Sequence, residues 1–252
     1  MNKTALITGA TSGIGEATAH TLAKLGYDII ITGRRAEKLE QVKQEICAAY
    51  PVKVLALCFD VRVKKECCKA IASIPEEFSE ITVLFNNAGL AAGLEHIQDG
   101  DTDDWERMID TNIKGVLYMT RCVAPLMIKQ GKGHIINMGS IAGTEVYENG
   151  TVYCASKHAM NALSKGMRID MLSSGIKVSQ IRPGMVETEF SVVRFHGDQQ
   201  RADNVYKGVK PLTGADIASV VEWLVTLPEH VNINDVEIMP VQQADAFYTY
   251  RK

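Results

Sequence analysis

Tyr153 and Lys157 stand four residues apart in the stretch YCASK, and a phenol beside an ammonium could move a proton. On a helix this spacing puts both side chains on one face. A free phenol titrates near about 10, too high for an efficient base at neutral pH, but a neighbouring positive charge lowers its pKa. An amphipathic pair on an exposed helix would have the same spacing, so the rest of the chain must decide between the two interpretations.

Ser140 and Asn112 could complete such a site. Ser140 ends the apolar run HIINMGS, at the carboxyl end of a predicted strand, where ligands bind in open α/β sheets. Its hydroxyl could hydrogen bond a carbonyl or alkoxide oxygen and stabilise the developing charge. Asn112 falls in the middle of a predicted helix, an unfavourable place that tends to mark a functional residue. The alternatives are a turn serine and a buried asparagine with satisfied hydrogen bonds.

The elements that must position these side chains follow from the hydrophobic pattern. Short apolar runs lack strict alternation, as expected for strands of a parallel sheet buried on both faces, and helix-length amphipathic segments separate them. The predicted strands span 4–8, 28–32, 52–59, 82–87, 134–140, 177–183 and 231–240, and the predicted helices 13–26, 35–49, 63–74, 103–129, 151–173 and 214–227. This order predicts one α/β domain over 1–252, a doubly wound parallel sheet of about seven strands with helices on both faces. The polar segment 185–212 is long for a connection and is predicted to be a substrate lid.

A glycine-rich turn, TGATSGIG, follows the first predicted strand and places Gly9, Gly13 and Gly15 ahead of a helix. Such a turn lets the backbone approach a pyrophosphate at the helix N-terminus, where free N–H groups and the helix dipole favour anions. The spacing differs from the common G-x-G-x-x-G, and Glu16 stands where a Walker loop needs lysine. A plain turn would look similar, but its place after the first strand predicts a dinucleotide site.

The end of the second predicted strand indicates which dinucleotide binds. NAD sites usually place an acidic residue about 20 residues beyond the glycines, on the ribose 2′-hydroxyl. Here Gly33 takes that place, and Arg34 and Arg35 follow. A guanidinium binds phosphate oxygens bidentately, so these arginines predict NADP(H). Two solvated arginines at the start of a helix are the alternative.

Composition and charge exclude several function classes. A net charge of −3 provides no basic surface for nucleic acid or membrane, and the apolar runs fall short of the roughly 20 residues that cross a bilayer. The start MNKTALITG enters a strand directly, so we expect no signal peptide and a cytoplasmic location. The six histidines form no metal motif, so no metal site is expected. The six cysteines lack CxxC spacing and are interpreted as reduced thiols, with Cys67 and Cys68 in packing roles.

With these motifs in place, the chain resembles the short-chain dehydrogenase/reductase family over nearly its full length. The motifs that carry the resemblance are TGATSGIG, Asp60–Val61, NNAG at 86–89, TN at 111–112, GS at 139–140, YCASK and PGMVET at 183–188. The resemblance implies a Rossmann-type fold, a nicotinamide cofactor and a homotetramer. It also implies a catalytic proton relay through Asn112, Ser140, Tyr153 and Lys157, in which Asn112 holds a water that connects Lys157 to solvent.

The same motifs imply a set of cofactor-binding residues. Asp60 would hold the adenine amino group, the backbone of 87–89 would line the cofactor, and Thr188 would contact the carboxamide or phosphates. The whole set is Gly9, Thr11, Ser12, Gly13, Ile14, Gly15, Arg34, Arg35, Asp60, Val61, Asn87, Ala88, Gly89, Tyr153, Lys157, Pro183, Gly184, Val186 and Thr188.

Within the family, the stretches TGRRAEKL, NNAGLAAG, GHIINMGSIAG and ETEFSVVRFHGD resemble the NADP-dependent 3-hydroxy acid (serine/allo-threonine) dehydrogenases, and the sulfoacetaldehyde reductases are similar too. Both groups imply a small anionic hydroxy compound or its aldehyde as substrate. A buried anion needs a partner charge. Arg194 could clamp it from the lid and Tyr147 could hydrogen bond it from the opposite wall, next to Ser140 and Tyr153.

Two other functions stay open at this point. A reductase of bulkier neutral carbonyls, such as steroids or diketones, would suit the methionines Met138 and Met185, which adapt to apolar ligands. A dinucleotide-sensing protein without activity is also possible on this fold, although the intact proton relay argues against it. The tail QQADAFYTYRK departs from the 3-hydroxy acid pattern, and its aromatics are predicted to pack over a pocket or against a neighbouring subunit.

Overall fold

Seven apolar runs of the chain pair into one parallel sheet in the computed structural model, which describes residues 3–252. The strands are β1 Thr4–Thr8, β2 Asp28–Gly33, β3 Val54–Cys58, β4 Ile81–Asn86, β5 His134–Met138, β6 Lys177–Pro183 and β7 Asp235–Ile238. Their order in the sheet is β3-β2-β1-β4-β5-β6-β7. The order reverses between β1 and β4, and ligands bind at the carboxyl edge of such a switch point. The predicted doubly wound sheet is confirmed.

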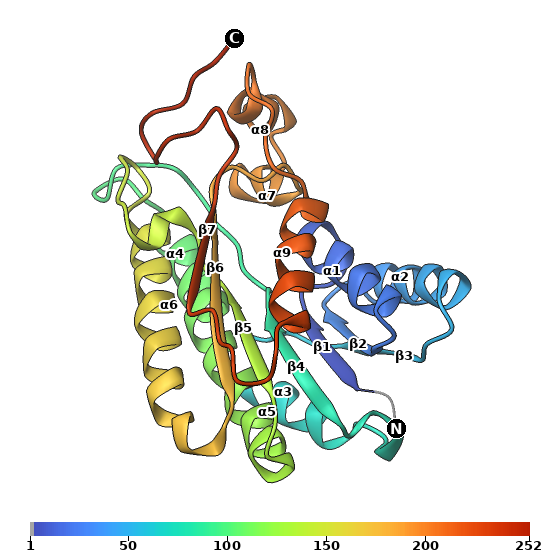
Figure 1. The fold of residues 1–252 in the computed structure, drawn as a ribbon. Helices are drawn as coiled ribbons and strands as arrows, with labels where there is room; N and C mark the ends of the chain where they lie inside the picture. The colour runs from blue at the N-terminus through green and yellow to red at the C-terminus, as the bar shows by residue number, and fades with distance from the viewer. Residues whose placement is uncertain (1–2) are drawn as a thin grey trace.

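Helices cover both faces of the sheet (Figure 1). Helices α1 (Gly13–Lys24), α2 (Ala36–Ala49) and α9 (Gly214–Thr226) lie on one face, and α3 (Lys64–Ala72), α5 (Val116–Gln130) and α6 (Thr151–Asp170) on the other. Because successive side chains of a strand point to opposite faces, Ile29 and Ile31 enter the first core while Ile30 enters the second. Short 3-10 turns, η1 Glu76–Phe78, η3 Ile141–Gly143 and η4 Leu172–Ser174, complete the connections.

The helix predicted over 103–129 is wrong as one continuous α-helix. It comprises α4 (Thr102–Ile109), a π-helix η2 (Asp110–Gly115) and α5. A π-turn adds one residue to a helical turn, and such turns often occur at functional sites. The apolar period continues across the break, so the sequence pattern did not reveal it. The wider turn carries Thr111 and Asn112, both of which are buried.

The polar segment 185–212 folds into two short helices, α7 (Phe190–Arg194) and α8 (Gln199–Tyr206), at the carboxyl edge of the sheet (Figure 1). The Tyr206 hydroxyl donates to the Val186 carbonyl at 3.0 Å, and the Leu212 N–H donates to the Met185 carbonyl at 2.9 Å. These bonds hold the segment to the chain that leaves β6. Within 3–252, no helix is long and apolar enough to cross a membrane.

Candidate active site

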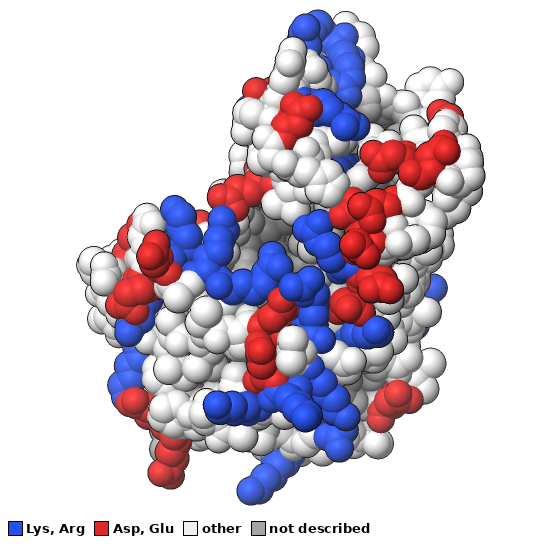
Figure 2. Space-filling model, turned by 180° about the vertical axis from the view of Figure 1, so that it is seen from behind, with Lys and Arg blue, Asp and Glu red and all other residues white. Residues whose placement is uncertain are grey.

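A cavity of about 640 Å³ opens at the carboxyl edge of the sheet, between the glycine-rich turn and α7. Its walls include Arg34, Arg35, Ser140, Tyr153 and Lys157, residues that lie far apart in the sequence. Figure 2 shows a hollow in this face of the molecule, with lysine and arginine side chains gathered along its lower rim. A pocket with a basic rim suits an anionic ligand.

The glycine-rich turn has the backbone that its residue types require. Gly9 and Gly13 have φ of 66° and 59°, in the left-handed region that favours glycine. A Cβ on Gly15 would lie 2.3 Å from the Gly9 carbonyl oxygen, so a side chain does not fit there. Asn87 fastens the turn, because its Nδ2 donates to the carbonyls of Thr8 and Gly9 at 3.0 and 3.1 Å. The sequence motif predicts that Asn87 lines the pocket but not this structural role.

Arg35 lies across the mouth of the turn and already has partners. Its NH2 group donates to Thr11 Oγ1 at 2.8 Å and to Ser12 Oγ at 3.0 Å. The same nitrogen forms an ion pair with Glu189 at 2.9 Å. The hydrogen bond with Arg35 holds the pKa of Glu189 below its usual value, against the opposing effect of burial. The carboxylate therefore carries its negative charge into the region that the sequence assigns to phosphate.

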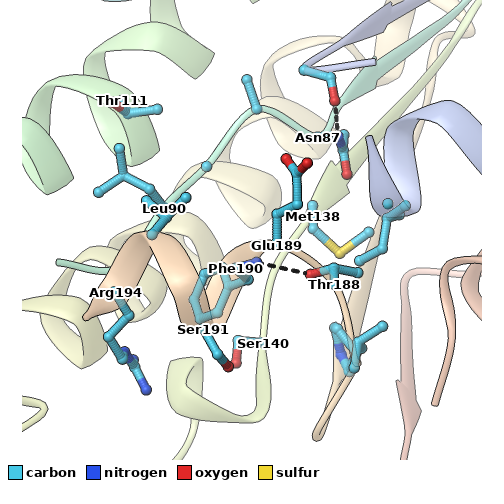
Figure 3. A pocket seen from close by; sticks show the side chains of 18 of the residues that line it. Asn87, Leu90, Thr111, Met138, Ser140, Thr188, Glu189, Phe190, Ser191 and Arg194 are labelled. Carbon is cyan, nitrogen blue, oxygen red and sulfur yellow. Dashed lines mark hydrogen bonds between the residues drawn. The ribbon is translucent and has the colours of Figure 1, made fainter. Parts of the chain in front are cut away.

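Glu189 is a pocket residue that the sequence analysis missed. It precedes α7, and its side chain points into the pocket in Figure 3. Next to it, Phe190 N–H donates to Thr188 Oγ1 at 3.2 Å, and a Cβ on Gly13 would lie 2.9 Å from Thr188 Cγ2. The glycine-rich turn and the start of the segment 185–212 thus lie against each other.

Asp60 forms an ion pair within the pocket wall. Its Oδ2 accepts from Arg62 Nε at 2.9 Å and from Arg62 NH2 at 2.6 Å. Burial would raise the pKa of Asp60, but the hydrogen bonds with Arg62 hold it below its usual value. Its expected contact with an adenine amino group remains a prediction, and adenine would have to share this carboxylate with Arg62.

Tyr153 and Lys157 both lie on α6 and both are buried, with exposed fractions of 9% and 5%. Lys157 Nζ is 5.8 Å from the centroid of the Tyr153 ring and donates to the Met138 carbonyl at 2.9 Å. Ser140 follows β5 and accepts from the Ala142 N–H at 3.1 Å. The fold therefore brings the phenol, the ammonium and the hydroxyl to one wall of the pocket.

The pKa of Tyr153 differs from the sequence-based expectation. Burial raises it above its ordinary value, and nearby Tyr147 adds to the rise. The charge that lowers it most is Arg194, not Lys157 as expected, followed by a hydrogen bond with Ser140. Burial lowers the pKa of Lys157 to about 8, so this amine stays mostly charged near neutral pH, but it is not among the groups that lower the phenol pKa. The phenol is therefore held in its neutral, proton-donating form.

The Asn112 side chain forms hydrogen bonds to the backbone of Leu90 and to the side chain of Ser156. Its Oδ1 accepts from the Leu90 N–H at 2.9 Å, and its Nδ2 donates to the Leu90 carbonyl at 2.8 Å and to Ser156 Oγ at 3.0 Å. The amide thus joins the π-helix, the chain after β4 and α6. All its side-chain hydrogen-bonding groups have partners here, and the water relay implied by the family resemblance remains a prediction.

Arg194 reaches into the pocket from α7 and lies over aromatic rings. Its Cζ is 5.0 Å from the centroid of the Tyr153 ring and 5.3 Å from that of Phe190. One NH2 donates to the Tyr147 hydroxyl at 2.7 Å. The Nε is buried and has no hydrogen-bond partner among residues 3–252. Arg194 as a whole is half-buried, but a buried donor without a partner is costly unless a ligand supplies an acceptor.

Other residues of the pocket were also missed in the sequence. Phe190 packs edge-on against Tyr153, with centroids 5.7 Å apart, and it lies in the ETEF stretch that carried part of the resemblance. Gln243 and Ala246 of the tail line the pocket, and Gln243 Oε1 accepts from the Met185 N–H at 2.7 Å. No local sequence signal marks these two residues.

The aromatics of the tail do not cover the pocket, which was one of the two expectations for them. Phe247, Tyr248 and Tyr250 are 65%, 75% and 68% exposed. The backbone of the tail is held instead, with the Ala246 N–H donating to Glu145 Oε2 at 2.7 Å and the Lys252 N–H donating to the Gly208 carbonyl at 3.0 Å. The backbone contacts orient these rings toward solvent.

Residues 3–199 match the family model of the short chain dehydrogenases. The chain belongs to this family. The resemblance carried by the sequence motifs is thus confirmed, and the protein is an oxidoreductase.

Two relatives and one solved structure match this protein over nearly the whole chain. An NADP-dependent 3-hydroxy acid dehydrogenase of Schizosaccharomyces pombe is 46% identical over 99% of this chain and 97% of that protein. A sulfoacetaldehyde reductase of Chromohalobacter salexigens is 44% identical over 97% of this chain and 96% of that protein. A solved closed form of serine dehydrogenase complexed with NADP+ superposes with a TM-score of 0.92, at 42% identity and 99% coverage of both chains.

Proposed function

We propose that this short-chain dehydrogenase transfers a hydride between NADP(H) and a small anionic hydroxy compound or its aldehyde or ketone. The substrate pairs considered are a 3-hydroxy acid with its semialdehyde and isethionate with sulfoacetaldehyde. The observation that carries the substrate class is Arg194, a half-buried guanidinium beside Tyr153 whose buried Nε has no partner among the described residues. The names of the two relatives support the same class.

The pocket fits a dinucleotide at several points. Gly9, Gly13 and Gly15 leave room for a pyrophosphate at the start of α1, where Ser12 makes no capping hydrogen bond. Arg34 and Arg35 line the end of the pocket beside β2 and would hold a 2′-phosphate. When bound, the nicotinamide supplies or accepts the hydride.

The proton chemistry falls on Tyr153. In the reducing direction, its neutral phenol donates a proton to the substrate oxygen as that oxygen gains negative charge. The Ser140 hydroxyl hydrogen bonds the same oxygen and stabilises the charge. In the oxidising direction the phenol must first lose its proton, and nearby Arg194 favours this loss because it lowers the phenol pKa. Lys157 and Asn112 position this end of the pocket.

Assembly and location form part of the proposal. We propose a cytoplasmic location and a homotetramer. The assembly is supported by α5, the end of α6 and the following turn η4, which expose apolar side chains that a partner subunit would cover. Leu117 and Ile128 are 40% and 43% exposed, and Ile169 and Leu172 are each 75% exposed. Light scattering after size-exclusion chromatography measures the assembly, and a monomer would refute it.

The proposed activity is tested by NADPH oxidation with sulfoacetaldehyde, malonic semialdehyde and a neutral diketone at matched concentrations. We expect kcat/KM to favour the two anions over the diketone. A preference for the sulfonate would identify an isethionate-forming reductase, and a preference for the carboxylate a 3-hydroxy acid dehydrogenase. Equal or better turnover of the diketone would support the alternative of a reductase for bulkier neutral carbonyls.

The Arg34→Asp variant is expected to lose preference for NADPH over NADH. The change removes a donor to the 2′-phosphate and adds a carboxylate that suits a free 2′-hydroxyl, so the ratio of kcat/KM values should fall by about tenfold or more. Lys43→Asp makes the same charge change on α2 without lining the pocket and should leave the ratio unchanged. An unaltered ratio in Arg34→Asp would remove Arg34 from the phosphate site.

The Glu189→Gln variant is expected to bind NADPH more tightly. In the wild type, the carboxylate pairs with Arg35 at 2.9 Å and competes with a phosphate for that cation. An exposed ion pair of this kind contributes about 1 kcal/mol of free energy, which the phosphate must overcome to bind Arg35. Its removal should therefore lower the Kd for NADPH roughly fivefold in a fluorescence titration. Glu187→Gln, two residues away and without an ion pair among the described residues, is the matched control. Weaker binding by Glu189→Gln would mean that the carboxylate supports the cofactor site.

A further inference from the structure

Two cysteines far apart in the sequence meet on the face of the sheet that carries α3, α5 and α6. Cys68 on α3 and Cys122 on α5 have their Sγ atoms 3.0 Å apart. A disulfide bond is about 2.05 Å long, so little movement separates this contact from a covalent bond. Among residues 3–252, no other two thiols form a hydrogen-bonded contact.

The two thiols differ in access to solvent. Cys68 is exposed and Cys122 is half-buried. Burial and the hydrogen bond with Cys68 raise the pKa of Cys122 to about 12, so this thiol stays protonated at neutral pH. An oxidant in solution therefore meets Cys68 first. Cys122 lies on a different side of α5 from Leu117 and Ile128, so the proposed subunit contact does not require it.

We propose that Cys68 and Cys122 are a redox modification site that forms a reversible disulfide between α3 and α5. With a small-molecule disulfide as oxidant, the Cys68 thiolate attacks one of its sulfurs, breaks the S–S bond and releases one thiol. Cys122 then attacks the Cys68 sulfur, and its proton passes to the departing thiolate, which leaves as the second thiol. The two protein thiols lose two electrons, and the oxidant gains them as two thiols.

The bond would act on the wall of the dinucleotide pocket. The first turn of α3 holds that wall, because Glu66 Oε2 accepts from the Asp60 N–H at 2.9 Å and Cys67 Sγ donates to the Val61 carbonyl at 3.4 Å. On the other side, a Cβ on Gly115 would lie 2.9 Å from Val61 Cγ2, just before α5 begins. A bond between α3 and α5 therefore draws together the two helices that enclose Asp60 and Val61.

The test uses the purified full-length protein, incubated with oxidised glutathione and quenched with an alkylating agent. We expect the intact mass to show two fewer alkyl groups than the reduced and alkylated protein carries, and peptide analysis to find Cys68 linked to Cys122. Dithiothreitol before alkylation should reverse both changes. Cys122→Ser should instead retain a glutathione adduct on Cys68, because no second thiol resolves it. Cys47→Ser removes another exposed thiol and should still form the bond.

Two outcomes would overturn the site: a stable glutathione adduct on Cys68 of the wild type, or a link between Cys67 and Cys68. Cys68→Ser provides a second variant at an exposed position, where it should fold, and it should lose the link. The coupling to the pocket is measured separately, as the Kd for NADPH of crosslinked and reduced wild type. A Kd that does not change on crosslinking would refute the coupling while leaving the bond established.

Discussion

Replacement of Tyr153 by phenylalanine should abolish turnover in both directions while NADPH still binds. The change removes the hydroxyl that exchanges a proton with the substrate and retains the ring that packs against Phe190 at 5.7 Å. Loss of a general acid or base costs about 10²- to 10⁴-fold in rate, so kcat should fall by at least that amount. Steady-state kinetics measures the loss, and fluorescence titration measures the Kd for NADPH, which should stay close to the wild-type value.

Tyr147→Phe is the matched control for this variant. It removes another phenol of the pocket, whose hydroxyl accepts from Arg194 at 2.7 Å. Because Tyr147 contacts the proposed anion clamp, its loss should affect KM more than kcat. Substantial turnover by Tyr153→Phe, or an equal loss of kcat in both variants, would show that Tyr153 does not carry the proton transfer.

Replacement of Arg194 by methionine should raise KM steeply for an anionic substrate and little for a neutral alcohol. Methionine has a similar length and keeps an apolar contact with Phe190 and Tyr153, but it removes the buried Nε that has no partner among residues 3–252. Hydrogen bonds to charged groups contribute about 1.5–3 kcal/mol, which corresponds to roughly a 10- to 100-fold rise in KM. The same assay with both substrates measures the difference.

Arg201→Met is the control for a lid arginine outside the pocket. Arg201 lies on α8 with its Cζ 4.3 Å from the centroid of the Phe195 ring, and it does not line the cavity. Its loss should leave both KM values close to wild type. If Arg194→Met changed the KM of the anionic and the neutral substrate by the same factor, Arg194 would have a structural role and the anion clamp would be refuted.

The sequence predicted secondary structure correctly where the local hydrophobic pattern matches the burial that the final fold imposes. Strands such as DIIITG at 28–33 are apolar throughout, because both faces of a parallel sheet are covered, and each predicted strand was found within a few residues. The prediction of one continuous helix over 103–129 was wrong because a π-turn leaves the apolar pattern intact. The π-turn ends at Gly115, which packs closely against Val61, 54 positions away in the chain, and such a contact is not visible in a local pattern.

The sequence by itself determined which residues are available for chemistry: the glycine-rich turn, the arginines after β2, Ser140 and the pair Tyr153 and Lys157. Residue type and spacing along one element are local properties, so their pattern can be recognised without the fold. Tertiary structure alone decided what those residues contact. It set Glu189 against Arg35, placed Arg194 instead of Lys157 as the main charge acting on Tyr153, and brought Cys68 to Cys122. These contacts join separate elements, and they depend on how both cores pack as a whole and on the loss of water that packing brings.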